Sequence, residues 1–153
     1  RAGGAATILN PAPAAELPDE MLALCDYITP NETEAEGLTG VPVKTVADAE
    51  PAAKALLSRG VGAAIITLGE NGVWFDDGTV AEHVPAMYAG PVVETTGAGD
   101  AFNGGFAAAI ARGMAPLDAV RFGNATAAIS VTRPGTAPSM PLRSEVETLM
   151  AKD

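Results

Sequence analysis

The sequence predicts an α/β fold with a mostly parallel sheet, and two observations support this prediction. Short apolar runs typical of strands alternate with longer segments in which apolar residues recur at helical spacing. In addition, the run 63–68 is apolar throughout, as expected of a strand that helices cover on both faces. With 153 residues, of which 48% are hydrophobic, the chain is also expected to form a single core.

The individual elements follow from periodicity and from residues that begin or end helices. Asn31 is predicted to begin an acidic helix that Gly40 ends, and Thr45 with Asp48 to cap a longer one. Strands are expected over 6–9, 26–29, 63–68, 72–75 and 79–84, with a further strand at 92–93. Helices are expected over 17–24 and 32–38, from Thr45 to near Arg59, from the turn at 96–100 to about Arg112, over 116–132, and after a capping box formed by Ser144 and Glu147.

Composition disfavours several kinds of partner. Nine basic against 19 acidic residues give a formal charge of -10, which repels a phosphate backbone, so we expect no nucleic-acid partner. No apolar run is long enough to span a bilayer, and we expect no membrane partner. The lone Cys25 cannot form an internal disulfide, and a reducing cytoplasm is therefore the expected location.

The segment most indicative of chemistry is Thr-Thr-Gly-Ala-Gly-Asp at 95–100, at the start of a predicted helix. Glycines there let a ligand approach the backbone, and the free amides of a first helical turn attract an anion. The carboxylate of Asp100 would repel a bound phosphate, so its presence at an anion site suggests a chemical role there. In phosphoryl transfer, an Asp can accept the proton of the attacking hydroxyl while amides stabilise the moving phosphoryl group. The alternative is an ordinary glycine-rich helix start, with Asp100 favoured there by the helix dipole.

Other enzyme classes are disfavoured by the motifs that the sequence lacks. Phe102 stands where a dinucleotide-binding fingerprint has its third glycine. No glycine-rich stretch ends in Gly-Lys-Ser/Thr, and His83 lacks the Arg-Asp neighbours of a protein-kinase catalytic loop. One His and one Cys cannot form a zinc cluster, and no Gly-x-Ser-x-Gly elbow is present.

Four segments, in order along the whole chain, resemble the ribokinases of the PfkB sugar-kinase family. They are Asn-Pro-Ala-Pro at 10–13, Thr-Pro-Asn-Glu-Thr-Glu-Ala-Glu at 29–36, Ile-Thr-Leu-Gly at 66–69 and Thr-Thr-Gly-Ala-Gly-Asp-Ala-Phe-Asn-Gly at 95–104. Gly-Ala-Gly-Asp marks the broad family, whereas the first two segments are similar to ribokinase rather than to fructokinase or adenosine kinase. The resemblance implies a ribokinase-like three-layer αβα fold and ATP-dependent phosphorylation of D-ribose at O5.

The resemblance also implies roles for particular residues. Asp100 would contact the sugar and take the proton from its primary hydroxyl. The amides of Gly97, Ala98 and Gly99 would form an anion hole for the γ-phosphoryl group, so Gly99 also contacts ATP. Asn124, inside a predicted helix, would lie near the adenine, and its alternative is a helix-surface residue.

The same resemblance implies which residues bind magnesium and the ATP phosphates. Asn31 and Glu34 match an Asn-x-x-Glu motif that holds Mg²⁺ and phosphates largely through water, which suits an ion that dehydrates reluctantly. Taken alone, the same pair could be a helix cap with a solvated acidic face. Thr67, Gly69 and Gly72 would line the ATP phosphates and ribose, and otherwise they are turn residues.

The resemblance also implies a potassium site, whose ligands are mostly backbone carbonyls. The matching positions are Glu94, Thr96, Ser130, Arg133, Gly135 and Ser139. The family's usual Asp is replaced here by Glu94, which is one methylene longer. Either the ion is held differently, or potassium dependence is weaker.

The resemblance covers only the C-terminal half of a ribokinase, with residues 1–153 as the ATP-binding and catalytic half. The family's sugar-binding half and its lid, which mediates dimerisation, lie outside the matched stretch. We therefore expect the full-length protein to be a homodimer and this chain alone to be inactive. The alternatives are another PfkB-family sugar or nucleoside kinase, or a non-catalytic nucleotide-binding half-domain.

Overall fold

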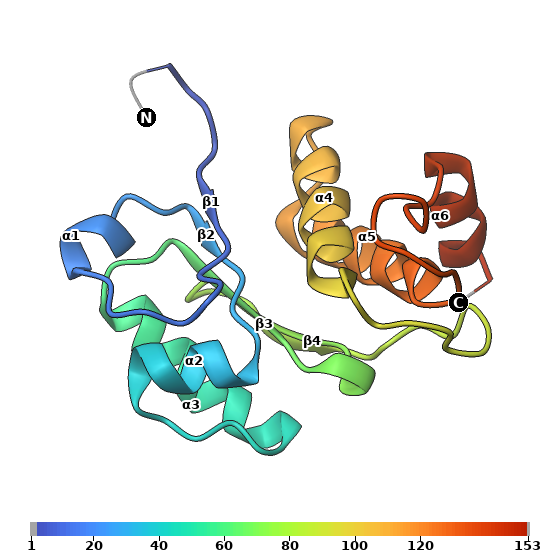
Figure 1. Cartoon of the computed structure of the whole chain (residues 1–153). Coiled ribbons are helices and arrows are strands. Elements are labelled where there is room, and N and C mark those ends of the chain that lie inside the picture. Colours follow the sequence, from blue (N-terminus) through green and yellow to red (C-terminus); the bar gives the residue numbers. More distant parts are fainter. Residues whose placement is uncertain (1–2, 153) are drawn as a thin grey trace. The chain divides into compact units, whose positions relative to one another are not determined.

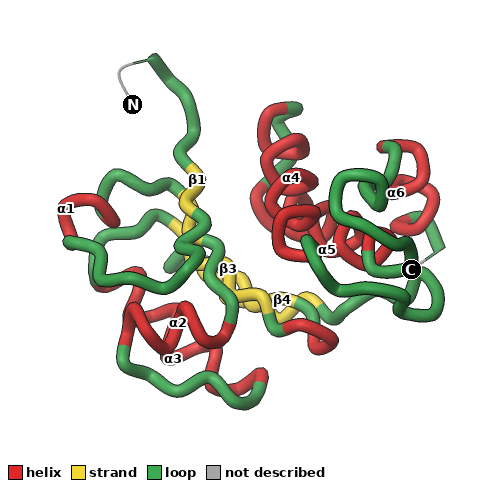
Figure 2. Tube along the Cα trace, viewed as in Figure 1, coloured by secondary structure: helices red, strands yellow, loops and turns green. Residues whose placement is uncertain are grey.

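The computed structural model describes residues 3–152, which form two compact units on either side of the Val84–Pro85 bond. Length alone predicts a single core. The difference has a physical reason: within residues 3–152, all the paired strands precede residue 85, and the residues after it bury their apolar side chains between helices instead. Figure 1 shows the elements of each unit, and Figure 2 marks where helix, strand and loop alternate along the chain.

The first unit contains a five-stranded sheet in the order β1-β2-β3-β4-β5. The strands are β1 (Ile8–Leu9), β2 (Tyr27–Ile28), β3 (Ala63–Thr67), β4 (Val73–Asp76) and β5 (Ala81–Val84). β1, β2 and β3 are parallel to one another, whereas β4 and β5 are antiparallel to their neighbours. The predicted hairpin is present, and the predicted first two strands are shorter than expected because only two residues of each pair with a neighbour.

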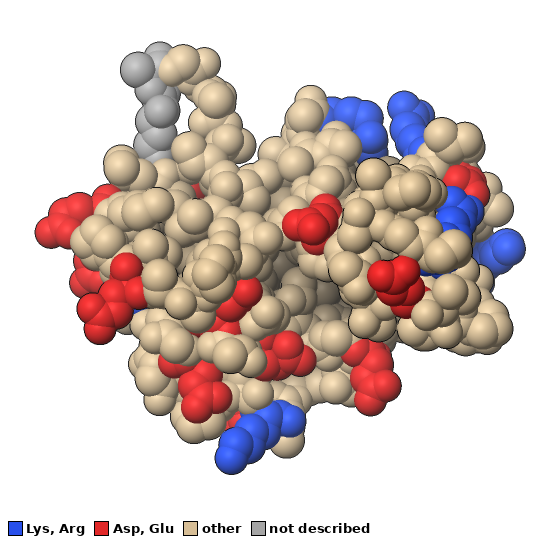
Figure 3. Space-filling view, viewed as in Figure 1, with Lys and Arg blue, Asp and Glu red and all other residues tan. Residues whose placement is uncertain are grey.

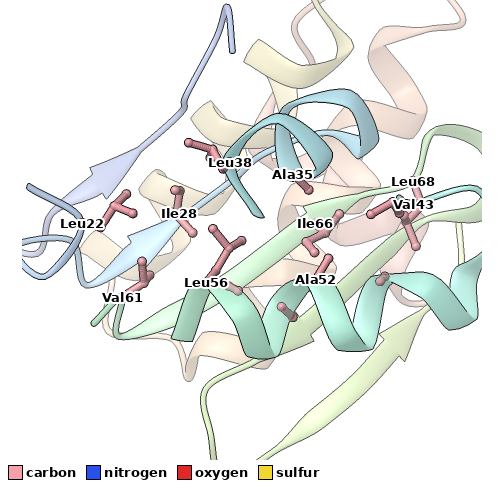
Figure 4. Packing of buried hydrophobic residues seen from close by; sticks show 13 residues of the cluster. Leu22, Ile28, Ala35, Leu38, Val43, Ala52, Leu56, Val61, Ile66 and Leu68 are labelled. Atoms are coloured by element: carbon pink, nitrogen blue, oxygen red, sulfur yellow. The ribbon is translucent and has the colours of Figure 1, made fainter. Parts of the chain in front are cut away.

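Helices cover one face of this sheet, and they are α1 (Asp19–Leu22), α2 (Glu32–Thr39) and α3 (Val46–Ser58). Figure 4 shows Ile28 and Ile66 pointing from the sheet toward Leu56 and Ala52 of α3, and all four side chains are fully buried. Burial of one such branched side chain stabilises the fold by about 1.5–3 kcal/mol. The packing fixes the carboxyl ends of β2 and β3, which matter for the site.

The second unit consists of α4 (Ala98–Ala111), α5 (Pro116–Ser130) and α6 (Arg143–Met150) with their connecting loops. α4 and α5 pack closely because small residues face one another. A Cβ atom added at Gly105 would lie 2.4 Å from Thr126 Oγ1, so only glycine permits this approach of the two helices. Phe102 and Phe106 stack on the buried face of α4 with their ring centroids 6.2 Å apart.

Two predicted features of the second unit are wrong. Val92 and Val93 form a loop rather than a strand, since Val93 N–H and Glu94 N–H both donate to the single carbonyl of Val131 and no ladder forms. α6 begins one residue before Ser144, and Glu145, not Glu147, accepts from the backbone at the helix start. The helix start is set by which carboxylate reaches the free amide, here that of Leu142.

The surface is rich in acidic side chains over α1, α2 and α3, as the face drawn in Figure 3 shows. Within residues 3–152, every helix is too short or too polar to traverse a lipid bilayer.

Candidate functional site

The start of α4 is the centre of the candidate site. Gly97 precedes the helix with φ +80°, a left-handed conformation that L side chains rarely adopt, and this turn directs the chain into the helix. Asp100 lies in the first helical turn and is exposed. Across the described residues, no hydrogen bond or ion pair engages its carboxylate. A free carboxylate at a helix N-terminus, where the dipole favours negative charge, is available to accept a proton from a bound alcohol.

The backbone amides of the turn divide into two kinds. Ala98 N–H donates to the Thr95 carbonyl at 3.1 Å, so it serves the turn itself. The N–H groups of Gly97, Gly99 and Asp100 have no acceptor within residues 3–152. Unpaired amides in the first turn of a helix can bind an anion. The donors available here are the N–H groups of Gly97, Gly99 and Asp100, whereas Ala98 N–H is occupied by the Thr95 carbonyl.

The loop between α5 and α6 packs against this turn. A Cβ atom at Gly97 would lie 3.1 Å from Thr136 Cγ2, so glycine is needed there for close packing as well as for its positive φ. Glu94 Oε2 accepts from Gly135 N–H at 2.8 Å. This bond from the Gly135 amide, together with one from the Thr96 side chain, holds the pKa of the Glu94 carboxyl below its ordinary value.

Of the other predicted potassium positions, Ser130 is the last residue of α5, and Arg133 and Ser139 lie in the loop that follows it. Arg133 N–H donates to the Ser130 carbonyl at 3.2 Å, and the Ser130 hydroxyl donates to Ala127 O. Ser139 is buried, and its hydroxyl donates to Thr136 O at 2.7 Å. The structure thus brings Glu94 and Thr96 together with Gly135, while Ser130 and Arg133 are joined to each other.

An alkali cation needs several oxygen ligands. A carboxylate together with backbone carbonyls is the kind of ligand set that replaces the hydration shell of K⁺. However, the Glu94 carboxylate already receives the Gly135 amide. A carboxylate offers about four lone-pair sites, so the residues fit a cation that shares this group with the amide.

In the first unit, Asn31 and Glu34 form a reciprocal capping box at the start of α2. Asn31 Oδ1 accepts from Glu34 N–H and Glu34 Oε2 accepts from Asn31 N–H, each at 2.9 Å. The helix-cap prediction is therefore confirmed, but Glu34 is only 9% exposed and does not belong to a solvated face. Its side chain is held by the cap, and its second oxygen has no partner among the described residues. The Glu34 carboxylate therefore fits the role of an outer ligand, which contacts Mg²⁺ through a water molecule.

Residues at the end of β3 lie next to this cap. Thr67 forms an isolated parallel bridge with Asn31, and Thr67 N–H donates to Pro30 O at 2.9 Å. The turn then continues through Gly69 with φ +53° and Gly72 with φ +91°. A Cβ at Gly69 would lie 4.0 Å from the Glu32 carboxylate. Asn31, Thr67 and Gly69 thus gather at the carboxyl ends of β2 and β3, where open α/β sheets usually bind ligands.

Asn124 is buried in α5 rather than on the helix surface, with 5% of the residue exposed. Its Nδ2 donates to the Pro85 carbonyl at 2.6 Å and so holds the segment that enters the second unit. This contact accounts for a polar side chain among apolar neighbours, since a buried amide without a partner costs free energy.

The predicted residues therefore form two groups, one in each unit. Three further contacts were missed at the sequence level: Asn103 Nδ2 donates to Gly99 O at 2.9 Å, Thr136 packs on Gly97, and Glu145 pairs with Arg133. The spacing of Asn103, one helical turn after Gly99, could have indicated the first contact. The other two join residues far apart in the sequence, and no local pattern records them.

Comparison with known proteins places these features in a family context. Residues 1–143 match the model of the pfkB family carbohydrate kinases. The chain is 46% identical to a ribokinase of Haemophilus influenzae over 142 residues, which cover 93% of this chain and 46% of that protein. It is 41% identical to a deoxyribokinase of Salmonella typhi over 139 residues, which cover 90% of this chain and 45% of that protein. The chain spans about half the length of the curated relatives it matches.

Solved structures agree with the sequence comparisons. The structure of Arabidopsis thaliana ribokinase complexed with ribose and ATP has a TM-score of 0.91 and 33% identity, and the match covers 97% of this chain and 48% of that one. A putative ribokinase II of E. coli in complex with ATP and Mg²⁺ has a TM-score of 0.80 and 28% identity, covering 99% of this chain and 50% of that one. The predicted α/β class and the resemblance carried by the four sequence segments are confirmed.

Proposed function

The chain belongs to the pfkB family of carbohydrate kinases, and from this premise we propose that it is the catalytic half of an ATP-dependent sugar kinase. The substrate is D-ribose, and the product is D-ribose 5-phosphate. One observation of the structure supports this proposal above the others: Asp100 is exposed and unpaired at the start of α4, beside amides without acceptors.

In the proposed reaction, the Asp100 carboxylate accepts the proton of the sugar O5 hydroxyl as that oxygen attacks the γ-phosphorus of ATP. The new O5–P bond forms while the bond from the γ-phosphorus to the bridging oxygen of ADP breaks, and ADP leaves. A general base contributes about 10²- to 10⁴-fold to such a step. The amides of Gly97 and Gly99 stabilise the negative charge on the moving phosphoryl oxygens, with Ala98 N–H available to join them if it turns from Thr95 O.

ATP and magnesium are the proposed cofactors. On the family resemblance, Thr67, Gly69 and Gly72 contact the phosphates and ribose of ATP, and Asn124 contributes to the adenine site. Asn31 and Glu34 hold Mg²⁺ through water. Bound magnesium supplies charge neutralisation at the phosphates.

Potassium is proposed where the segment before α4 that carries Glu94 meets Gly135 of the loop between α5 and α6, with further oxygens from the positions that the resemblance implies. The residues that hold it would be Glu94, Thr96, Ser130, Arg133, Gly135 and Ser139. Because the Glu94 carboxylate already accepts the Gly135 amide, we expect only weak potassium dependence.

The sugar-binding half is proposed to lie in a longer protein, because the chain spans about half the length of its relatives. On this proposal the chain by itself does not turn over sugar, and the full-length protein is a cytoplasmic homodimer. A non-catalytic nucleotide-binding half-domain is the alternative from another functional class. Within the kinases, a 2-deoxyribose kinase is the second candidate, because a deoxyribokinase is 41% identical to this chain.

The test is a phosphoryl-transfer assay of the full-length protein with ATP, Mg²⁺ and one acceptor at a time: ribose, 2-deoxyribose, fructose or adenosine. We expect ribose to have the highest kcat/KM, with the phosphate on O5 by ³¹P NMR. A preference for 2-deoxyribose or adenosine would replace the proposed substrate. Calorimetric ATP binding without turnover of any acceptor would favour the non-catalytic half-domain.

A further inference from the structure

The Arg133–Glu145 ion pair of the second unit is far in sequence from the turn at 94–99 but is linked to it through one loop. Arg133 lies in the loop between α5 and α6, and Glu145 lies in the first turn of α6. Both nitrogens at the end of the guanidinium donate to the Glu145 carboxylate, one to each oxygen. Such a two-point contact fixes the orientation of both groups as well as their distance.

Glu145 is itself immobilised by a second bond. Its Oε2 accepts from Leu142 N–H at 2.7 Å, which satisfies a free amide at the start of α6. The ion pair therefore joins the loop to a fixed point on α6 and not to a mobile surface side chain. The Arg143–Glu147 pair is different, because it joins two exposed residues of α6 itself.

The loop 131–139 has a hydrogen bond of its own and another to the end of α5. Ser139 is 2% exposed, and its hydroxyl donates to Thr136 O, while Arg133 N–H donates to Ser130 O. Gly135 provides a left-handed bend with φ +81°. These contacts limit the conformations that the loop can adopt.

The same loop contacts the turn at three points. Val131 O accepts from the N–H groups of Val93 and Glu94, Gly135 N–H donates to Glu94 Oε2, and Thr136 packs against Gly97. A shift of the loop therefore changes both the position of Glu94 and the space beside Gly97, two residues before Gly99.

We propose that Arg133 and Glu145 are positioning residues for the phosphate-binding turn, acting through the loop 131–139. The proposal rests on the proposed kinase function for its catalytic consequence, whereas the mechanical link stands on the contacts alone. Neither side chain is proposed to touch ATP or sugar. Their effect is to hold Glu94 and Gly97 where the amides of the turn point to the phosphoryl group.

The test compares Arg133→Met with Arg143→Met, which removes the same guanidinium from an ion pair that lies within α6. In the full-length protein we expect Arg133→Met to lower kcat about tenfold, because misplacement of reacting groups by an ångström can cost about 10²-fold. The KM for sugar should change much less. Arg133→Lys should recover part of the loss, and Arg143→Met should keep wild-type kcat.

A readout independent of catalysis is amide hydrogen exchange at Glu94 and Gly135, whose N–H groups bond across the turn and loop. We expect faster exchange there in Arg133→Met and in Glu145→Gln, but not in Arg143→Met. Unchanged exchange at both amides would overturn the proposal, even if the variant melts at a lower temperature. If Arg133→Met does not fold, the exchange rates of Glu145→Gln test the proposal instead. Gln at this position can still accept from Leu142 N–H but has no charge to pair with Arg133.

Combination with Glu94→Ala separates the link from a general loss of stability. The two variants break one chain of contacts, so the double variant should lose less kcat than the product of the single losses. Full additivity would contradict transmission through Glu94. A wild-type protein with no kinase activity would refute the proposed function, while the exchange result would still decide whether the link exists.

Discussion

Two glycines at the start of α4 are required for different physical reasons. Gly97 has φ +80°, and Thr136 occupies the space beside it, so any side chain there strains the turn. Gly99 has ordinary helical geometry and open space where a Cβ would point. Its lack of a side chain is therefore not needed by the fold, and it leaves the backbone accessible to a ligand.

This difference gives a prediction for Gly99→Ala. The variant should be as stable as the wild type or up to about 1 kcal/mol more stable, because Ala is the better helix residue. Its kcat should fall by up to about 10²-fold, because the added methyl group keeps the phosphoryl oxygens away from the Gly99 N–H, and loss of one oxyanion donor costs about that much. Gly104→Ala in the same helix, also facing open space, is the matched control and should keep full activity. Equal kcat in both variants would show that Gly99 is not at the site.

The carboxylates of Glu94 and Glu145 predict a pH dependence of stability. Hydrogen bonds from Gly135 N–H to Glu94, and from the Arg133 side chain to Glu145, lower the pKa of both groups in the folded chain. A group whose pKa is lower when folded binds fewer protons than when unfolded. Its stabilisation is thus present above the unfolded pKa of about 4.3 and is lost as pH falls through the folded value.

Thermal melts of the wild type and Glu145→Gln between pH 7 and pH 3 measure this effect. The wild type should lose Tm as the pH falls below the ordinary Glu range, and Glu145→Gln should show a smaller loss because one contributor is removed. Parallel curves for the two proteins would show that the Arg133 contact does not shift the Glu145 pKa.

At the scale of elements, α2 combines a structural cap with a predicted ligand role. Asn31 and Glu34 satisfy each other's backbone amides at the helix start. α3 begins in a similar way, since Asp48 accepts from Lys44 N–H, Thr45 N–H and the Thr45 hydroxyl, but no ligand role is predicted there. The two helix starts therefore form a natural comparison.

Asn31→Ala should lower the free energy of unfolding by about 1 kcal/mol, the typical effect of a lost N-cap, and should also raise the KM for MgATP. Asp48→Ala should lower stability as well but leave the KM for MgATP unchanged. Chemical denaturation and steady-state kinetics of both variants provide the measurements. An unchanged KM in Asn31→Ala would mean that the Asn31 side chain serves only the helix.

The two capped helices also show what the sequence could predict. Their starts depend on residues three apart, as at Asn31 and Glu34, and both were predicted correctly. The segment at 92–93 has a strand composition but no paired neighbour in the described chain, so tertiary context prevented a strand. At α6, the sequence offers both Glu145 and Glu147 near the free amides, and only the folded geometry shows that Glu145 reaches one.

The candidate site was predictable to the same degree. The turn at 95–100 and the pair at 31 and 34 each lie within a few residues of sequence, so a local sequence motif can predict them. The contacts of Arg133 with Glu145, and of Glu94 with Gly135, depend on how loops distant in sequence meet. Periodicity and composition contain no information about such pairs.

For the whole molecule, charge is distributed unevenly along the chain. Thirteen of the 19 acidic and four of the nine basic residues precede residue 85, so the formal charge is -9 before it and -1 after it. The proposed contacts to the ATP phosphates therefore include residues from a strongly acidic unit. Long-range repulsion should oppose binding of the anionic MgATP complex.

Screening tests this effect. When ionic strength rises from about 0.01 M to about 0.15 M, the Debye length falls from about 30 Å to about 8 Å. The KM for MgATP of the full-length protein should then decrease a few-fold. Tetramethylammonium chloride is the suitable salt, because it does not replace potassium at a cation site. A rising KM would indicate that basic residues dominate the field at the nucleotide.

The role of Asp100 is the central claim, and its substitution by Asn is the most direct measurement. Asn keeps the size and exposure of the side chain but cannot act as the base. With ribose, MgATP and the full-length protein, we predict that Asp100→Asn lowers kcat by about 10²- to 10⁴-fold while ATP affinity and Tm change little. A variant that folds, binds ATP and phosphorylates ribose at close to the wild-type rate would contradict the account.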